Sequence, residues 1–497
     1  MNNIKLSHFI LVSVFLSIPV VLLNTYYADD LYRSALATYG WESDGRLFSL
    51  ALYYIISVGG SLSDLYPFSQ MTAYALLGIT AYIVSSRIIE DKSIIGLIIT
   101  LPIITSPLLL GNLLYRFDAL TMMSGVLCAT APFAFRVASK RVLFIYSPIL
   151  LLSSLSFYQA SSIAFVSLSA MEFFKSTMKD ESLSKSFLRL SYRASASFLR
   201  LSYRASASAL FGGFIGFKVI NSIFVVKNDY TEQLSKLVSL DKNAPEKIID
   251  TFIKSMDLIY MFSKGGIGKI IFIFLIAVTI SCLIIIFRKA THSAMGSLTR
   301  TLVGVIVSLI ISFLCIPGFI LLANTPVFYP RLYIGFGFFF VFGGYVVHYA
   351  IKNKRCLYIL IVLPLAFTSI NLSTINAIRN QDHNNFVFSL DLKNDIYNKV
   401  GLNDFDDITF YGEIKHPESV SHVIEKYPFT KWIIGNYFHW SYDIGRWVLR
   451  QNDLTLNYSS PEVASNVIER HKAESPIAVR QGYDLYLIDR HILVAFK

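Results

Sequence analysis

The sequence predicts a mainly α-helical fold, in which a polytopic membrane bundle of about eleven transmembrane helices is followed by a small C-terminal α/β domain. The first observation is the composition, which is far more apolar than that of a typical soluble protein: 54% of the 497 residues are hydrophobic, 15% are charged and the mean hydropathy is +0.53. The second observation is that long apolar runs alternate with short loops rich in Lys and Arg. The third is a change to soluble composition after residue 378, which divides the chain into 1–378 and 379–497.

Apolar stretches long enough to cross a bilayer as helices recur along residues 1–378. The first has no small-x-small cleavage motif before Asn24, so it is expected to remain as a spanning helix. The run 47–58 is too short to cross and predicts a helix lying along the membrane surface, whereas 142–174 is too long and is divided at Tyr158. The predicted spans are 4–23, 71–86, 93–110, 119–135, 142–157, 160–174, 208–226, 270–287, 301–323, 333–351 and 357–378.

Loop charges give this topology an orientation, because short cytoplasmic loops carry the excess of Lys and Arg. With the N-terminus inside, every basic cluster falls on the cytoplasmic side: Arg87 and Lys92, Arg136 to Arg141, Lys175 to Arg204, Arg288 and Lys289, and Lys352 to Arg355. The external segments are then 24–70, 111–118, 227–269, 324–332 and the whole region 379–497.

The net charge of +11 does not indicate nucleic-acid binding, because the basic residues follow the membrane topology. The four cysteines have no CxxC spacing and lie in or beside apolar segments, so neither a disulfide framework nor a zinc site is expected. The sequence also lacks a P-loop, a GxGxxG motif before a helix, HExxH and GxSxG. The sequence therefore gives no motif support for nucleotide-driven transport or for hydrolysis by a zinc or serine enzyme.

The cytoplasmic loop 175–207 contains a perfect tandem repeat, SFLRLSYRASA at 186–196 and again at 197–207. A spacing of eleven residues keeps helical phase, so a second copy can lengthen a basic surface helix without breaking it. The favoured interpretation is an insertion tolerated in a surface loop.

The C-terminal region is expected to contain a helix at 417–426 and strands at 408–412 and 484–496. Its aromatic residues are dense enough to build a carbohydrate-stacking surface, although packing in the domain core is favoured for most of them. These residues are Tyr427, Phe429, Trp432, Tyr437, Phe438, Trp440, Tyr442 and Trp447.

Asp29 and Asp30 are the candidate catalytic residues, since they lie just beyond the external end of the first predicted helix. One carboxylate would accept a proton from an attacking hydroxyl while the other orients it or binds a cation. The alternative is a helix cap or a solvated acidic pair. The neighbouring Tyr32 and Arg33 favour a functional role as part of a substrate-binding surface.

The same external loop contains a second cluster, GWESDGR, with Trp41, Asp44 and Arg46 as further substrate-binding candidates. Tyr158 and Gln159, at the break in 142–174, either face the external surface or form hydrogen bonds within the bundle, and both alternatives stay open.

Two short external loops add arginines beside aromatic residues, Arg116 with Asp118 and Arg331 with Tyr329. A guanidinium group stays charged and can donate two parallel hydrogen bonds, so an arginine is well suited to bind a phosphate group. The alternative for both arginines is snorkelling to the membrane surface. Lys218 lies in the middle of a predicted span, so it is expected to be buried with a polar partner.

The segments DDLYR, GWESDGR, YRFD, YQAS and YPR, in this order over residues 20–340, resemble the bacterial Gtr-type (GtrII-like) O-antigen glucosyltransferases. These are serotype-converting integral membrane enzymes of the inner membrane, related to the GT-C superfamily of glycosyltransferases. The C-terminal domain matches them only in placement, as expected of a region that varies with the acceptor.

The resemblance implies transfer of a glucosyl residue, with inversion, from polyprenyl-phosphate-glucose to the lipid-linked O-antigen of lipopolysaccharide on the periplasmic face. It also implies a separate enzyme that loads the lipid and a separate flippase. Family members place a carboxylate in the first external loop, which corresponds to Asp29 or Asp30, and Arg116 and Arg331 are the candidates for binding the leaving phosphate. No cofactor is expected; a divalent metal could bind the aspartate pair but is not required.

Two other functions use the same lipid pool. A transporter or flippase for a lipid-linked sugar is disfavoured because no inverted repeat and no paired Gly/Pro-broken spans are visible in the sequence. An O-antigen polymerase would also place external arginines near a polyprenyl pyrophosphate, but the early aspartate pair favours the glucosyltransferase.

Overall fold

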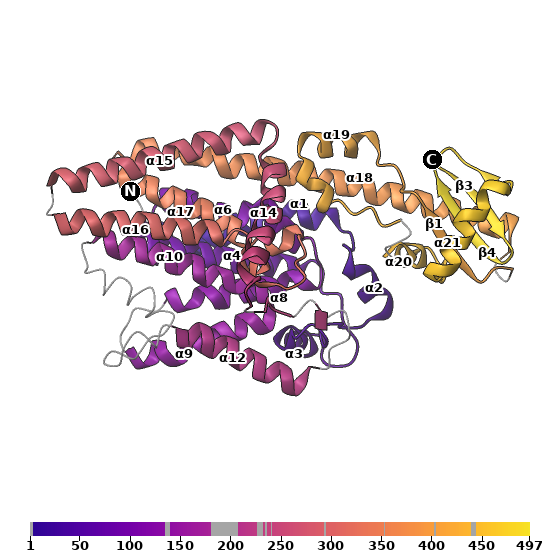
Figure 1. Cartoon of the computed structure of the whole chain (residues 1–497), viewed down its shortest axis with the longest axis horizontal. Coiled ribbons are helices and arrows are strands. Elements are labelled where there is room, and N and C mark those ends of the chain that lie inside the picture. Colours follow the sequence, from indigo (N-terminus) through magenta and orange to yellow (C-terminus); the bar gives the residue numbers. More distant parts are fainter. Residues whose placement is uncertain are drawn as a thin grey trace. The chain divides into compact units, whose positions relative to one another are not determined.

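The computed structural model divides the chain into two compact units, residues Met1–Leu22 with Tyr39–Leu372, and residues Leu23–Thr38 with Ser373–Lys497. Each is described by itself (Figure 1). The described residues are 3–134, 140–179, 207–225, 232–233, 236–239, 241–292, 295–351, 353–401, 404–438 and 444–497. The tandem repeat at 186–207 lies almost entirely outside them.

The first unit is built of helices throughout its described part. Its α-helices are α1 Leu6–Leu23, α3 Leu47–Ile56, α4 Phe68–Ile83, α5 Ile94–Thr100, α6 Pro102–Thr105, α7 Pro107–Leu113, α8 Asp118–Thr130, α9 Lys140–Phe157, α10 Ile163–Met178, α12 Ala207–Phe224, α14 Ala244–Ser263, α15 Gly266–His292, α16 Met295–Leu314, α17 Gly335–Ala350 and the first part of α18 Val362–Lys399. A π-helical turn, Val84–Ile89, extends α4, and short 3₁₀ segments lie at Ala131–Phe133, Gln159–Ser162, Gly318–Leu322, Pro330–Leu332 and Lys354–Ile361.

Several of these helices are long and apolar enough to cross a membrane, which fits a membrane protein. In the described part of the chain five helices pass this test, or six if one bent pair counts as a single span. The predicted count of eleven is therefore not confirmed. Several predicted spans form helices shorter than 18 residues, such as α8 with 13 residues, because turns end them earlier than hydropathy suggests.

The predicted span 93–110 is not one straight helix, and this expectation is corrected. The segments 94–105 and 107–113 meet at a bend of 60°. Pro107 follows the break and has no N–H for a continuing helix, while Ser106 is extended at ψ 120°.

The division of 142–174 is confirmed. Helix α9 ends at Phe157, Tyr158 is extended at φ −159°, and α10 starts at Ile163 after one 3₁₀ turn. The break interrupts the regular helical hydrogen bonds between the two helices, and it lies within the candidate site described below.

Lys218 is exposed on α12, so the expected burial is wrong. Helix α12 packs on α9 through a close approach of Gly213, whose added Cβ would lie 3.1 Å from Leu151 Cβ. Lys218 faces away from that contact. A lysine on the outer face of a helix can extend its aliphatic side chain along the apolar surface, so that its ammonium group reaches water.

The second unit combines several helices with a four-stranded sheet. Its elements are α2 Asp29–Leu36, the remainder of α18, β1 Asp407–Tyr411, α19 Glu418–Lys426, a 3₁₀ segment Pro428–Trp432, α20 Ile444–Gln451, α21 Pro461–Arg470, a 3₁₀ turn His471–Ala473, β2 Ala478–Val479, β3 Tyr483–Ile488 and β4 His491–Phe496. The strand order is β1-β4-β3-β2, with β1 parallel to β4 and the other pairs antiparallel. The helix predicted at 417–426 and the strand predicted at 408–412 are confirmed within a few residues. The run predicted at 484–496 is extended but forms two antiparallel strands, β3 and β4, because the chain turns at Asp489 and Arg490.

Apolar side chains on one face of the sheet build the core of this unit, because every second side chain of a strand points to the same face. Ile408, Leu485 and Val494 are fully buried and pack with Leu392 and Ile396 of α18. Among the aromatic residues of this region, Phe429 and Phe438 are fully buried, Tyr427 and Tyr437 are buried, and Trp432 is 51% exposed. Core packing therefore holds for four of them, while Trp440 and Tyr442 lie outside the described residues.

Candidate functional site

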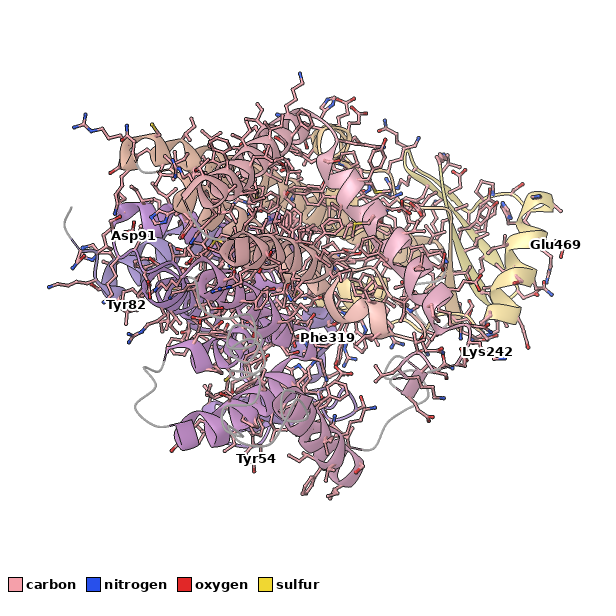
Figure 2. All side chains as sticks on the ribbon, turned by 60° about the vertical axis from the view of Figure 1, so that its left-hand side comes forward. Tyr54, Tyr82, Asp91, Lys242, Phe319 and Glu469 are labelled. Carbon is pink, nitrogen blue, oxygen red and sulfur yellow. The ribbon has the colours of Figure 1, made fainter. Side chains whose placement is uncertain are left out.

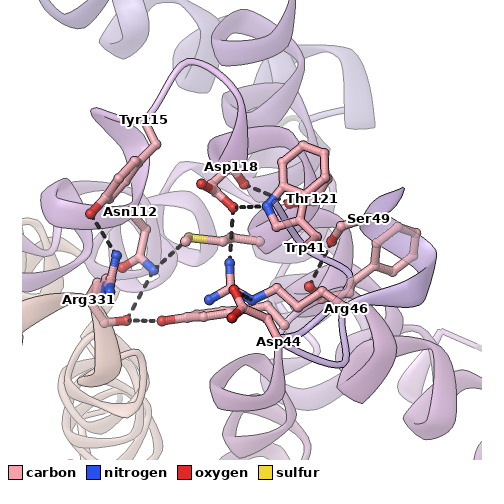
Figure 3. Close-up of polar contacts among 12 residues, drawn as sticks. Trp41, Asp44, Arg46, Ser49, Asn112, Tyr115, Asp118, Thr121 and Arg331 are labelled. Carbon is pink, nitrogen blue, oxygen red and sulfur yellow. Dashed lines mark hydrogen bonds and ion pairs between the residues drawn. The ribbon is translucent and has the colours of Figure 1, made fainter. Parts of the chain in front are cut away.

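The carboxylate of Asp118 is the centre of a polar network in the first unit (Figure 3). Asp118 is 1% exposed and begins α8, where the helix dipole favours a negative charge. Its Oδ1 accepts a hydrogen bond from Trp41 Nε1 at 2.7 Å and one from Arg46 Nη1 at 3.0 Å. One buried carboxylate oxygen thus fixes two side chains of the GWESDGR segment.

Arg46 is held on three sides. Besides Asp118, its guanidinium lies over the ring of Tyr158, 4.9 Å from the centroid, and its Nε lies 3.9 Å from Asp44 Oδ2. The Nε is buried, yet it makes no hydrogen bond to any described residue. Asp44 is about one-third exposed, and its carboxylate likewise makes no hydrogen bond within the described chain. Arg46 Nε and the Asp44 carboxylate thus form an ion pair at 3.9 Å with no hydrogen bond between them.

The local fold of GWESDGR follows from its glycines and its tryptophan. Gly45 has φ +71°, which side chains with a Cβ rarely adopt. Trp41 is fully buried against Tyr53, with ring centroids 5.0 Å apart. Gln159 Nε2 donates to the backbone oxygen of Asp44 at 2.9 Å, which joins the break between α9 and α10 to this turn.

A second arginine is fixed from α7 and from the α9–α10 break. Arg331 Nη1 donates to Tyr115 Oη at 2.6 Å, and its guanidinium lies 5.5 Å from the Tyr115 and Tyr329 ring centroids. The backbone oxygen of Arg331 accepts from Tyr158 Oη at 3.2 Å and from Asn112 Nδ2 at 3.0 Å. Figure 3 shows these contacts beside the Asp118 network.

Tyr158 connects the two arginine positions, because its ring contacts Arg46 and its hydroxyl donates to Arg331. Burial raises the pKa of Tyr158, against the opposing charges of Arg331 and Arg46. The phenol thus stays protonated at neutral pH and acts as a hydrogen-bond donor, not as a base.

Arg116 forms a separate contact group. Its Nη1 lies 2.9 Å from Asp64 Oδ2 and its guanidinium lies over the Tyr66 ring at 4.3 Å. Its backbone oxygen accepts from Ser69 Oγ at 2.7 Å and from Tyr53 Oη at 3.3 Å. Arg116 is 7% exposed, and its charge is paired with the Asp64 carboxylate, which is 29% exposed.

The predicted catalytic pair lies in the second unit. Asp29 and Asp30 occupy the first turn of α2, and Ala28 before them has φ +48°. Asp30 is fully buried and its Oδ2 accepts from Tyr27 N at 3.4 Å, whereas Asp29 is partly exposed. Asp30 therefore serves as a helix-start acceptor, and Asp29 is the more accessible of the two.

The surroundings of α2 belong to the C-terminal region. Tyr27 Oη donates to Ile433 O at 2.7 Å, Ala28 N donates to Tyr437 Oη at 3.1 Å, and the side chains of Thr25 and Asp382 are hydrogen-bonded. The ring centroids of Tyr32 and Trp447 are 6.3 Å apart. Arg33 is 2% exposed, with its guanidinium 5.6 Å from the Tyr32 ring centroid.

The structure thus joins most of the predicted substrate-binding residues into one network: Trp41, Asp44, Arg46, Asp118, Tyr158, Gln159, Tyr329 and Arg331. Asn112 and Tyr115 also take part in this network, whereas Asp64 pairs with Arg116 in the separate group; none of the three is among the predicted site residues. Tyr115 precedes Arg116 in the YRFD segment, and Asn112 lies inside an apolar run, where a buried amide needs a hydrogen-bond partner. Within the described residues no group of three or more His, Cys, Asp or Glu is placed to hold a metal ion.

Comparison with known proteins gives a family and one distant relative. Residues 18–342 match the model of the glucosyl transferase GtrII family. A protein of Salmonella phage P22, described as "Uncharacterized 55.3 kDa protein in gtrB 5'region", is 23% identical over 432 residues, which cover 84% of this chain and 85% of the relative. No solved structure matches the chain.

The family match covers well over half of the chain and contains every residue of the Asp118 network and the α2 pair. It also covers the span-length segments Phe68–Ile89 and Gly266–Thr291 and the broken segment 94–113. The resemblance found in the short motifs is thereby confirmed: this chain belongs to the glucosyl transferase GtrII family of glycosyltransferases.

Proposed function

We propose that this chain transfers a glucosyl residue from polyprenyl-phosphate-glucose to the lipid-linked O-antigen of lipopolysaccharide at the periplasmic face of the bacterial inner membrane. The family membership supports the sugar and the acceptor class. The apolar helices support a membrane setting, in which the prenyl tail stays in lipid while the phosphosugar head reaches the protein. A separate lipid-loading enzyme and a flippase would supply the donor.

The observation that carries this proposal is the pair of arginines joined by Tyr158. Arg46 and Arg331 are held by Asp118 and Tyr115, so their guanidinium groups are positioned before any ligand binds. Preorganised donors stabilise charge that develops on a departing phosphate at little reorganisation cost. The buried Nε of Arg46 still has no hydrogen-bond acceptor among the described residues, as expected of a group awaiting an anionic oxygen.

The proposed reaction is a single displacement with inversion at the anomeric carbon. A carboxylate takes the proton of the acceptor hydroxyl, the oxygen attacks the anomeric carbon, and the polyprenyl phosphate leaves. Asp29 is the favoured base of the α2 pair because Asp30 is fully buried and accepts the Tyr27 N–H. Asp44 is the second candidate, because its unbonded carboxylate lies beside Arg46.

O-antigen analysis tests this function in cells. Cells with the lipid-loading enzyme and flippase are compared with and without this chain, and the O-antigen sugars and linkages are determined. One added side-branch glucose per repeat unit is expected. An unchanged repeat unit with altered chain length would instead indicate a polymerase, and no change in either would contradict glucosyl transfer.

Three matched variants then identify the base. Asp29→Asn, Asp30→Asn and Asp44→Asn each keep side-chain shape and remove the negative charge, and membrane insertion is checked by immunoblot. A general base contributes about 10²–10⁴-fold in rate, so the variant lacking it loses transfer almost completely. If all three retain near-normal transfer, the carboxylate mechanism is wrong.

A further inference from the structure

Helix α14 lies across its neighbours instead of along them. In Figure 1 it crosses the direction of α15 and α16, and Figure 2 labels Lys242 just before it and Phe319 in the 3₁₀ segment that it contacts. The corner between α14 and α15 is sharp, because Gly265 has φ +78°. The corner is also tight, since a Cβ on Gly268 would lie 1.9 Å from Ser263 O.

One face of α14 packs on the bundle. Thr251, Ser255, Leu258 and Phe262 are each less than 5% exposed. The rings of Phe262 and Phe336 are 4.8 Å apart between centroids, and Tyr333 Oη donates to Ser255 O at 3.3 Å. These contacts fix how the helix is rotated about its own axis.

A second face is apolar and open. Ile249, Ile253 and Tyr260 are 58%, 59% and 63% exposed. Their spacings of four and seven residues place them on one stripe of the helix. The third face is charged, with Asp250 and Lys254 paired at 2.7 Å. Such a division into packed, apolar and charged faces suits a helix that lies in the plane of a bilayer surface.

The apolar face of α14 meets the exposed surface of α15 at the corner. The segment Gly266–Thr291 is strongly apolar and long enough to cross a membrane, and Phe272, Ile273 and Phe287 on it are 64–69% exposed. At the corner, the ammonium of Lys264 lies 4.8 Å from the centroid of the Tyr260 ring. Tyr and Lys gather at membrane surfaces, where the ring stays in the boundary and the charge reaches water.

We propose that α14 is an in-plane helix of the membrane surface, inserted into the boundary between headgroups and acyl chains through Ile249, Ile253 and Tyr260. Its partner is the lipid bilayer itself. The proposal rests on the membrane setting of α15 and is independent of the sugar transferred. It places the helix Ala244–Ser263, in the region expected to be an external loop, on the lipid surface.

Spin-label accessibility tests the proposal on the full-length chain in lipid nanodiscs. Single cysteines replace Ile249, Ile253, Asp250 or Lys254 in a chain whose four native cysteines are changed to alanine. Nitroxides at 249 and 253 are expected to collide several-fold more with oxygen, which dissolves in lipid, than with a water-soluble nickel chelate. Nitroxides at 250 and 254, the matched controls on the charged face, are expected to show the reverse.

Two results would overturn the proposal. Equal nickel access at all four positions would place the helix in water, and low access to both reagents at 249 and 253 would indicate a protein partner or a second copy. A second measurement retains the native cysteines: lipids brominated near the headgroup should quench Ile253→Trp more than Lys254→Trp. Equal quenching of the two variants would also contradict the proposal.

Discussion

Asp118 shows how a single buried carboxylate can organise a polar network, because it accepts hydrogen bonds from both Trp41 and Arg46. We expect Asp118→Asn to lower kcat for glucosyl transfer by roughly tenfold or more, because hydrogen bonds to charged groups contribute about 1.5–3 kcal/mol. The freed Arg46 would lose its orientation while the protein still folds. Transfer assays on purified protein measure kcat and KM separately.

The control for this variant is Ser49→Ala, which removes the hydrogen bond of Ser49 Oγ to Phe157 O but leaves Arg46 in place. Its kcat is expected to stay within about twofold of the parent, an effect of under 0.5 kcal/mol. An Asp118→Asn variant as active as Ser49→Ala would show that Asp118 does not position Arg46.

A second residue-scale prediction concerns Asp91, outside the spanning segments. Its carboxylate lies 2.9 Å from His348 Nε2 and accepts from Ser93 N at 2.8 Å. The hydrogen bond from His348 holds the pKa of Asp91 well below its usual range, with further lowering by Ser93 and Lys354. We expect Asp91→Asn to cost about 1–3 kcal/mol of stability at neutral pH.

The stabilisation by Asp91 is present above its unfolded pKa of about 4 and is lost as the pH falls toward the lower folded value. Thermal unfolding in detergent should therefore separate parent and variant at pH 7 and bring them together in acid. A difference that grows in acid would contradict this assignment.

The contacts between site residues that are far apart in the sequence could not be predicted. The motifs around Arg46, Asp118 and Arg331 could be selected because charged residues beside aromatics stand out against apolar runs. Their partners could not, since Arg46 and Asp118 are 72 residues apart and Arg331 and Tyr115 are 216 apart. Only packing of α3, α7 and α8 brings such positions together.

At the scale of elements, hydropathy predicted where helices occur better than where they end. The break at Tyr158 was predicted because a polar pair interrupts an apolar run, whereas the bend at Ser106 was missed because serine and proline were absorbed into a hydrophobic stretch. The element α14 was missed too, because its apolar stripe is spread among charged residues.

The link between α18 and the β2–β3 turn gives an element-scale prediction. Arg480 pairs with Asp395 through hydrogen bonds of 3.0 and 2.5 Å, and Tyr483 Oη donates to the same carboxylate at 2.7 Å. The hydrogen bonds from Arg480 hold the pKa of Asp395 below its usual value. We expect Asp395→Asn to destabilise this unit by about 1–2 kcal/mol at pH 7.

Because the folded pKa of Asp395 is lowered, its contribution is complete above about pH 4 and fades below it. Hydrogen exchange of the strands β3 and β4 reports the change within the full chain. The exposed pair Arg470–Asp489 supplies the control, and Asp489→Asn is expected to have a smaller effect. Equal effects of the two variants would contradict a specific role for the α18 link.

At the scale of the whole molecule, charge placement predicts a sidedness that labelling can test. Cysteines introduced at exposed positions of residues 379–497, for example at Trp432, should react with a membrane-impermeant thiol reagent from the periplasm of intact cells. A cysteine in place of Lys289 should react only after lysis. Labelling in the opposite pattern would reverse the predicted orientation.

The tandem repeat supplies another whole-chain prediction. Deleting residues 197–207 removes one complete copy and keeps the helical phase of the remaining sequence. Glucosyl transfer by the shortened chain is expected to stay within about twofold of the parent, as for a tolerated change in a surface loop. Complete loss of transfer at normal protein levels would show that the second copy is required.

Glucosyl transfer from a lipid-linked donor can be measured directly with the purified chain in vesicles. Polyprenyl-phosphate-[¹⁴C]glucose and lipid-linked O-antigen are the substrates, and label in the O-antigen is counted for the parent and for Arg46→Gln. Transfer by the parent with inverted anomeric configuration, reduced at least tenfold in the variant, is the expected result. Absence of label with the parent, or equal transfer by the variant, would contradict the account.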